Sequence, residues 1–275
     1  MKVIRHATAL CSNVVTVLRN PSNSGRRLAA TVRYLRERTI GRGSQAPTPF
    51  PFGRSSQIWV GPDRGSSRRA LLAPMPDFPE MAVWERHLQG GDLFIDVGAH
   101  VGFYSVFAAE LGAKVIAVEP QPDLAQCIRE NLALNRYDGQ VLEIALAEQA
   151  GIAFLGGGAD SSQHALTGGE AGIEVPVETI DAILGERVAS GMKIDVEGAE
   201  RLVVSGAARA LRERRIRLIQ LEWNACSQRN FGESREVLAD LLRSHGFSFF
   251  RPDAFGTLQP LSELSLGRDV FAMLQ

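Results

Sequence analysis

Five carboxylates stand at or just beyond the ends of apolar segments of the chain. They are Asp96, Glu119, Asp195, Glu197 and Glu222. Carboxylates that converge on one place are unfavourable unless they bind a cation or share protons. Their positions therefore indicate three kinds of chemistry, which are binding of a hydroxyl-bearing or cationic ligand, general base catalysis, and coordination of a divalent metal.

The densest pattern is the loop at 96–102, with the sequence Asp-Val-Gly-Ala-His-Val-Gly. Gly98 and Gly102 let the backbone turn tightly and approach a ligand, and the helix expected next offers free N–H groups. Glu119 follows 23 residues after Asp96, at the end of the next apolar segment, where an acid is placed to hold ribose hydroxyls. Since Asp96 would repel a pyrophosphate but suits a cationic amino-acid group, the pattern favours S-adenosylmethionine as the cofactor.

These residues lie in a region where short apolar strands alternate with helices. Strands are predicted at 93–97, 114–118, 141–146, 191–195, 216–222, 247–251 and 269–274, with helices at 79–88, 102–111, 122–135, 199–212 and 233–245 and added β segments at 151–155 and 173–177. Such alternation predicts a parallel sheet covered on both faces. The expected fold is α/β, a doubly wound, mostly parallel, seven-stranded Rossmann-like sheet, whose last two strands form a hairpin edge.

Three of the acids are expected to meet at the carboxyl ends of adjacent strands. Asp195 ends one strand, Glu197 follows two residues later, and Glu222 ends the next strand. All three are catalytic candidates, as the general base or as ligands of a divalent metal, with helix capping and salt bridges as the structural alternatives. His164 is a fourth catalytic candidate, because the polar, glycine-rich loop at 156–164 could fold over the same strand ends.

Three segments resemble the FkbM family of methyltransferases. They are 96–104, 118–120 and the Lys-Ile-Asp-Val-Glu-Gly-Ala-Glu stretch at 193–200. Members are class I, S-adenosylmethionine-dependent enzymes that typically act on hydroxyl oxygens. The resemblance implies the class I fold and O-methylation of a hydroxyl on a sugar, a glycan or glycolipid, or a secondary metabolite. His100 departs from the family pattern, which usually has Asn there.

The resemblance also implies which residues bind the cofactor. The loop at 96–102 would cradle the methionine part and Glu119 would hold the ribose. Ala145 and Leu146 would flank the adenine through backbone contacts. The full predicted cofactor-binding set is Asp96, Gly98, Ala99, His100, Gly102, Glu119, Pro120, Ala145 and Leu146.

Charge is unevenly distributed along the 275 residues. The formal net charge is -1, but residues 1–90 hold 14 Lys+Arg against 5 Asp+Glu, and residues 1–70 hold 13 against 2. We therefore predict a basic N-terminal appendage at 1–77, helical with a Gly/Pro-rich segment, and a methyltransferase domain at 78–275. Besides the hydroxyl acceptor, an anionic surface contacted through residues 1–70 is the partner that this charge indicates, and we do not expect nucleic acid.

Composition and motifs exclude several classes of protein. With 45% hydrophobic and 22% charged residues the chain is typical of a soluble protein, and no run approaches the ~18 apolar residues of a transmembrane helix. Three widely spaced cysteines predict a cytoplasmic setting, with attachment to the inner membrane face left open. A nicotinamide-dependent dehydrogenase would use Tyr-x-x-x-Lys, which is absent. The remaining alternative is a non-catalytic adapter whose basic N-terminus binds membrane or nucleic acid.

Overall fold

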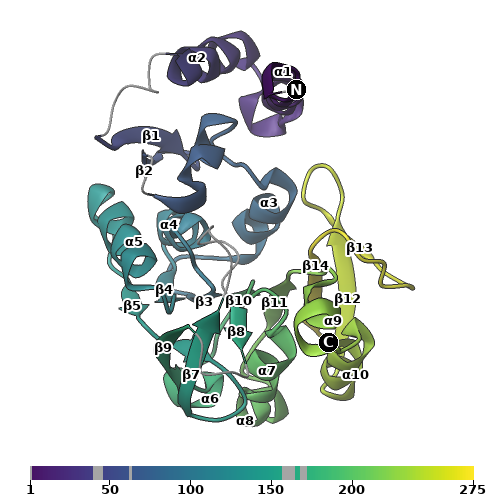
Figure 1. Cartoon of the computed structure of the whole chain (residues 1–275). Coiled ribbons are helices and arrows are strands. Elements are labelled where there is room, and N and C mark those ends of the chain that lie inside the picture. The colour runs from purple at the N-terminus through teal and green to yellow at the C-terminus, as the bar shows by residue number, and fades with distance from the viewer. Residues whose placement is uncertain (1, 40–45, 62–63, 157–164, 168–171) are drawn as a thin grey trace.

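An eight-stranded sheet with helices on both faces forms the centre of the structure (Figure 1). The structure is a computed structural model that describes residues 2–39, 46–61, 64–156, 165–167 and 172–275. The strands of this sheet are β3 (Leu93–Val97), β4 (Lys114–Val118), β5 (Gln140–Leu142), β10 (Gly191–Ile194), β11 (Leu218–Leu221), β12 (Phe247–Pro252), β13 (Leu258–Pro260) and β14 (Val270–Leu274). Their order is β13-β12-β14-β11-β10-β3-β4-β5.

The sheet is mostly parallel and doubly wound, as predicted. Strands β5, β4, β3, β10 and β11 are parallel neighbours, and β14 runs antiparallel between β11 and β12. The chain winds outward from β3 to β5 on one side and from β10 to β12 on the other. The direction of winding therefore changes between β3 and β10, which is where open α/β sheets bind ligands.

Two details of the predicted sheet are wrong. It has eight strands rather than seven, because residues 258–260 add β13; the last two predicted strands, β12 and β14, do pair antiparallel, but β13 rather than this pair forms the edge. Burial explains both differences. Val270, Phe271 and Ala272 of β14 are fully buried, whereas β13 is largely exposed and forms the edge.

The helices divide between the two faces of the sheet. Helices α3 (Phe78–His87), α4 (Phe103–Glu110) and α5 (Pro122–Leu134) pack in one hydrophobic cluster, and α6 (Ile180–Leu184), α7 (Glu200–Ser205), α8 (Ala208–Arg212) and α10 (Arg235–Ser244) pack in the other. Strand residues alternate between them, with Phe94 in the first cluster and Ile95 in the second, as the pleat requires. The short helix α9 (Cys226–Phe231) follows β11.

The helix predicted at 199–212 is two helices, α7 and α8, separated at Gly206 and Ala207. A Cβ at Gly206 would lie 2.1 Å from the carbonyl oxygen of Ala147, so only glycine allows this approach of the two backbones. Glycine also lowers helix propensity, which favours a break there.

A second, four-stranded sheet contains β6 (Ala145–Leu146), β7 (Gly151–Gly156), β8 (Ala165–Thr167) and β9 (Ile173–Glu178), in the order β6-β9-β7-β8. The β segments predicted at 151–155 and 173–177 are present as β7 and β9. The strand predicted at 141–146 instead divides between the two sheets. It ends in the main sheet at Leu142, whose carbonyl accepts a hydrogen bond from the N–H of Glu119.

The N-terminal region contains α1 (Lys2–Arg19), η1 (Pro21–Asn23), α2 (Arg27–Thr39), β1 (Thr48–Phe52), β2 (Ser56–Val60) and η3 (Gly65–Leu71). It packs on the side of α3–α5, at one end of the molecule (Figure 1). Tyr34, Phe52 and Ile58 belong to the same hydrophobic cluster as Phe103, and the rings of Phe52 and Phe103 stack at 5.0 Å. The division into 1–77 and 78–275 stays a prediction, but the core is continuous across it.

Two asparagines, one in α5 and one directly after it, join this region to the sheet. Asn131 is fully buried, with its Nδ2 donating to the carbonyl of Val101 at 2.8 Å and its Oδ1 accepting from the N–H of Trp59 at 2.8 Å. Asn135 pairs in the same manner with both backbone groups of Gln57. These side chains take the place of a neighbouring strand along β2.

We expect Asn131→Ala to lower the free energy of unfolding by about 3 kcal/mol, because it leaves a buried N–H and a buried carbonyl without partners. Urea unfolding measures this loss. Asn135→Ala is the matched control, since water reaches that partly exposed position and the loss should stay under about 1 kcal/mol. Equal losses in the two variants would contradict this account.

Candidate active site

A cavity of about 620 Å³ opens at the carboxyl ends of β3, β4, β10 and β11. Ten predicted site residues line it, namely Gly98, Ala99, His100, Glu119, Pro120, Ala145, Leu146, Asp195, Glu197 and Glu222. Asp96 and Gly102 are not among its lining residues. His164 lies outside the described residues, so its catalytic role stays a prediction. The sequence motifs therefore meet at one place, where the winding of the sheet changes direction.

The loop after β3 is held tightly against the end of β10. Gly98 has φ +72°, and a Cβ there would lie 1.9 Å from the carbonyl oxygen of Asp195, so no other residue fits. His100 also has a positive φ of 55°, an uncommon conformation for a residue with a side chain. Its Nδ1 lies 3.3 Å from Ser66 Oγ, so the N-terminal region contributes to this loop.

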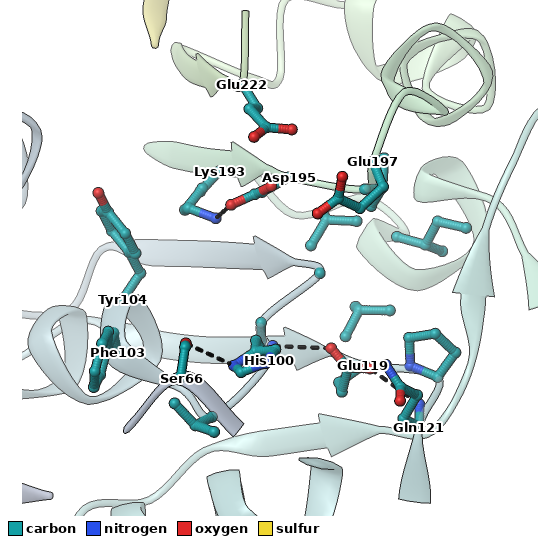
Figure 2. Close-up of a pocket in the computed structure, with 18 of the residues that line it drawn as sticks. Ser66, His100, Phe103, Tyr104, Glu119, Gln121, Lys193, Asp195, Glu197 and Glu222 are labelled. Carbon is teal, nitrogen blue, oxygen red and sulfur yellow. Dashed lines mark hydrogen bonds and ion pairs between the residues drawn. The ribbon is translucent and has the colours of Figure 1, made fainter. Parts of the chain in front are cut away.

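Glu119, which follows β4, is a buried acid in the cavity wall. Its two carboxylate oxygens accept hydrogen bonds from the N–H groups of His100 at 2.9 Å and Gln121 at 3.0 Å (Figure 2). Burial raises the pKa of Glu119 to about 7, although these two bonds oppose the rise. Each oxygen of an ionised carboxylate keeps acceptor capacity, so Glu119 can receive two further donors from a ligand.

Asp96 lies beside the cavity rather than in its wall. Its side chain is buried, and Oδ2 accepts a hydrogen bond from Ser105 Oγ at 2.6 Å. Burial raises the pKa of Asp96, and the positive charge of Lys193, its neighbour across β3 and β10, opposes this. A direct contact between Asp96 and a cofactor stays a prediction, and the visible role of Asp96 is to fix Ser105 and face Lys193.

Lys193 and Asp195 form an ion pair at the far side of the cavity. Lys193 Nζ lies 2.9 Å from Asp195 Oδ2 and 5.0 Å from the centroid of the Tyr104 ring (Figure 2). Burial alone would raise the pKa of Asp195, but the ion pair outweighs it and the pKa is lowered. Asp195 is therefore ionised at neutral pH and has little tendency to take up a proton.

The pKa of Glu222 is raised, whereas that of Asp195 is lowered. Burial first, and then the negative charges of Asp195 and Glu197, raise the pKa of Glu222 to about 8. Its Oε2 is buried and has no hydrogen-bond partner among the described residues. Glu197, with φ 53°, accepts a weak bond from Cys226 Sγ at 3.4 Å, and burial raises its pKa. Of the three predicted catalytic acids, Glu222 is therefore best suited to accept a proton near neutral pH.

The residues present do not fit the divalent metal that the sequence left open as an alternative role for Asp195, Glu197 and Glu222. Asp195 is already paired with Lys193. The side-chain atoms that lie within 4.8 Å of one another and could bind a metal belong to Glu197, Glu222 and Cys226. Burial raises the pKa of the Cys226 thiol to about 11, and Arg229 donates to its sulfur at 2.8 Å. The positive charge of this guanidinium disfavours a divalent cation bound at the same sulfur.

A buried ion pair holds the two loops that carry these acids. Glu200 Oε1 accepts from the N–H groups of Val196 at 3.3 Å and Gly198 at 3.1 Å, and Oε2 pairs with Arg235. Arg235 Nε also donates to the carbonyl of Asn224 at 3.0 Å. Glu200 thus positions the loop after β10, while Arg235 connects it to the loop after β11.

Sequence reasoning missed one side of the cavity. The residues concerned are Ser66, Arg69, Asp77, Glu80, Arg268 and Asp269. Asp269 precedes β14, which is antiparallel, so the start of this strand reaches the edge where its neighbours end. The sequence offered one indication of this side of the cavity, which is the carboxylate of Asp269 next to the last strand. The pKa of Glu80 is raised to about 7 and the pKa of Asp269 to about 6, and burial is the largest cause of both shifts.

The fold and the cavity define a Rossmann-like α/β protein with an acid-lined ligand site. The methyltransferase FkbM domain matches residues 96–249 of the chain. The chain is 31% identical over 201 residues to the 31-O-demethyl-FK506 methyltransferase FkbM of Streptomyces tacrolimicus, covering 58% of this chain and 74% of that protein. The chain therefore belongs to the FkbM family of methyltransferases, as the sequence motifs predicted.

Two further similarities are weaker. A protein-L-isoaspartate O-methyltransferase of Aeropyrum pernix is 43% identical over 103 residues, which cover 36% of this chain and 34% of that protein. The structure of the Pyrococcus abyssi tRNA (uracil-54, C5)-methyltransferase with S-adenosyl-L-homocysteine aligns with a TM-score of 0.44 and 11% identity, over 85% of this chain and 45% of that chain. A structural similarity at this level supports no conclusion about this chain.

We expect Arg235→Lys to reduce the rate of methyl transfer by about 10- to 100-fold, because the loops after β10 and β11 lose their fixed relative position. Lysine keeps the charge but cannot reach both Glu200 and Asn224. Steady-state kinetics should show the loss in kcat rather than in KM. Arg243→Lys is the control, because Arg243 is an exposed arginine of the same helix, and an equal loss there would contradict the role of Arg235.

Proposed function

We propose that this methyltransferase transfers a methyl group from S-adenosylmethionine to a hydroxyl oxygen of a sugar, a glycan or glycolipid, or a secondary metabolite. The observation that carries the proposal is Glu222, an unpaired carboxylate with a pKa near neutral inside the cavity. A hydroxyl acceptor needs such a base, because its proton must leave as the new bond forms. The name of the Streptomyces relative, which refers to an O-demethyl compound, supports the same acceptor atom.

The residues on the other side of the cavity fit S-adenosylmethionine. Gly98 brings backbone close to the cavity, Glu119 can accept bonds from the ribose diol, and Ile144, Ala145 and Leu146 offer an apolar wall for the adenine. When bound, this cofactor supplies a methyl group on a positively charged sulfur, which is an electrophile with a good leaving group. The excess of carboxylates in the cavity wall favours a cationic molecule of this kind.

In this proposal the cofactor and the acceptor occupy opposite halves of the cavity. The acceptor hydroxyl lies at Glu222, with Tyr104 and the Lys193–Asp195 pair alongside. As the oxygen bonds to the methyl carbon, its proton passes to the Glu222 carboxylate and from there to solvent. The permanent charge of Asp195 makes Glu222 a stronger base, so Asp195 acts on the proton through Glu222.

We also propose a cytoplasmic location for the reaction. The three cysteines are free thiols, of which Cys11 is exposed and Cys127 and Cys226 are buried. Free thiols persist in a reducing compartment.

The reaction is tested by incubating the full chain with methyl-labelled S-adenosylmethionine and small-molecule and glycan extracts of a strain that lacks the gene. Mass spectrometry and NMR then locate the label. We expect a labelled methoxy group. A labelled N-methyl or C-methyl product would overturn the proposed acceptor atom, and failure of S-adenosylhomocysteine to raise the melting temperature would overturn the cofactor.

We expect Glu222→Gln to lower kcat by about 10²- to 10⁴-fold, because the general base is lost, while binding of S-adenosylhomocysteine is retained. In the unsubstituted enzyme the rate should rise with pH and level off above the Glu222 pKa of about 8, since the base works when deprotonated. Asp195→Asn removes a negative neighbour and should shift this rise to lower pH. A pH profile that Glu222→Gln leaves unchanged would assign the base elsewhere.

Glu119 should make cofactor binding depend on pH. The ribose diol requires the ionised carboxylate, so affinity for S-adenosylhomocysteine should be constant above the Glu119 pKa of about 7 and fall by up to about tenfold per pH unit below it. Calorimetric titrations between about pH 6 and about pH 8 measure this. Glu119→Gln should bind weakly at every pH, whereas Glu174→Gln, exposed on β9, should keep the normal dependence. Binding that strengthens toward low pH would exclude this role.

A further inference from the structure

The N-terminal helices α1 and α2 carry the largest gathering of exposed apolar side chains. Of eleven large hydrophobic side chains that are exposed in the described residues, five lie on these two helices. On α2 they form a stripe of Leu28, Val32 and Leu35, which are 80%, 57% and 37% exposed. Their spacing of four and three residues places them on one helical face. On α1, Val15 and Leu18 are also exposed.

This apolar stripe is not needed to pack the helices onto the protein. The opposite faces do that, since Val17 of α1 and Ala30 and Tyr34 of α2 are buried in the main hydrophobic cluster. Asn13 Nδ2 donates to the Tyr34 hydroxyl at 2.9 Å, which fixes the two helices together. The exposed stripe is therefore presented on a rigid support.

The same helices are strongly basic. Residues 2–39 contain eight Lys or Arg residues and one acid, Glu37. Burial first, and then repulsion from Arg26, lower the pKa of Arg33. One acid cannot neutralise eight basic residues, so this region carries a net positive charge that favours an anionic partner.

We propose that the surface formed by α1 and α2 docks on an anionic lipid bilayer, with the Leu28–Val32–Leu35 stripe inserted at the level of the headgroups. Apolar side chains flanked by arginines on an amphipathic helix are the combination that binds membrane interfaces. A second copy of the chain is disfavoured as the occupant, because a symmetric contact would bring two such basic surfaces together. No described helix has the length and apolar character to cross a bilayer, so the contact is peripheral.

Co-sedimentation of the full chain with vesicles tests the proposal. We expect binding to mixed phosphatidylcholine and phosphatidylglycerol vesicles, much weaker binding to phosphatidylcholine alone, and release by high salt. The double variant Leu28→Asp/Val32→Asp should lower the partition coefficient by about tenfold or more. Removing one charge with Arg27→Gln should lower it about fivefold.

Phe255→Asp is the matched control, because Phe255 is equally exposed but lies between β12 and β13, and its partition should not change. Unfolding midpoints in urea verify that each variant is folded. Equal binding to neutral vesicles, or unchanged binding of the double variant, would overturn the proposal. Two other results would also overturn the proposal if the protein does not bind the vesicles. One is a dimer, seen by sedimentation, that the Leu28→Asp/Val32→Asp variant dissociates, and the other is binding of RNA.

Discussion

The buried ion pair between Glu200 and Arg235 fixes the geometry on which the cavity depends. A buried ion pair contributes little net stability, because desolvation offsets most of the attraction. Its contribution here is to fix the positions of two loops. Glu200 gathers the N–H groups of Val196 and Gly198, and Arg235 reaches the carbonyl of Asn224. The segments that follow β10 and β11 are therefore held at a set separation, and these segments carry Asp195, Glu197 and Glu222.

Acids held so close together cannot all behave alike. Asp195 has Lys193 at 2.9 Å and stays ionised, whereas Glu222 lacks such a partner among the described residues and feels the charge of Asp195. The result is one permanent carboxylate and one that exchanges a proton near neutral pH. Separation of two neighbouring carboxylates by their surroundings is a general way to obtain acid–base chemistry at neutral pH. In the proposed reaction Lys193 would thus act indirectly, by keeping Asp195 ionised beside Glu222.

The sheet and the loop at 96–102 were predictable, because a strand, a tight turn and a helix are adjacent in sequence and leave a periodic pattern. Asp195 and Glu222 followed from the rule that parallel strands end at one edge. Asp269 escaped that rule, since β14 is antiparallel and reaches the edge with its beginning. Arg69 lines the cavity through tertiary packing of a Gly- and Ser-rich segment, and such packing leaves no periodic signal in the sequence.

The N-terminal region connects the proposed membrane surface to the cavity. Asn23, between α1 and α2, donates to the carbonyl of Leu72 at the end of η3, and η3 supplies Ser66 and Arg69 to the cavity wall. An enzyme attached through α2 would hold its cavity at a fixed place relative to the bilayer, where acceptors on that surface have a raised effective concentration. The turnover of such acceptors would rise even if their affinity for the cavity stayed the same. The formal net charge of -1 therefore combines a basic N-terminal region, on which the proposed membrane surface lies, with an acidic remainder that contains most of the cavity's carboxylates.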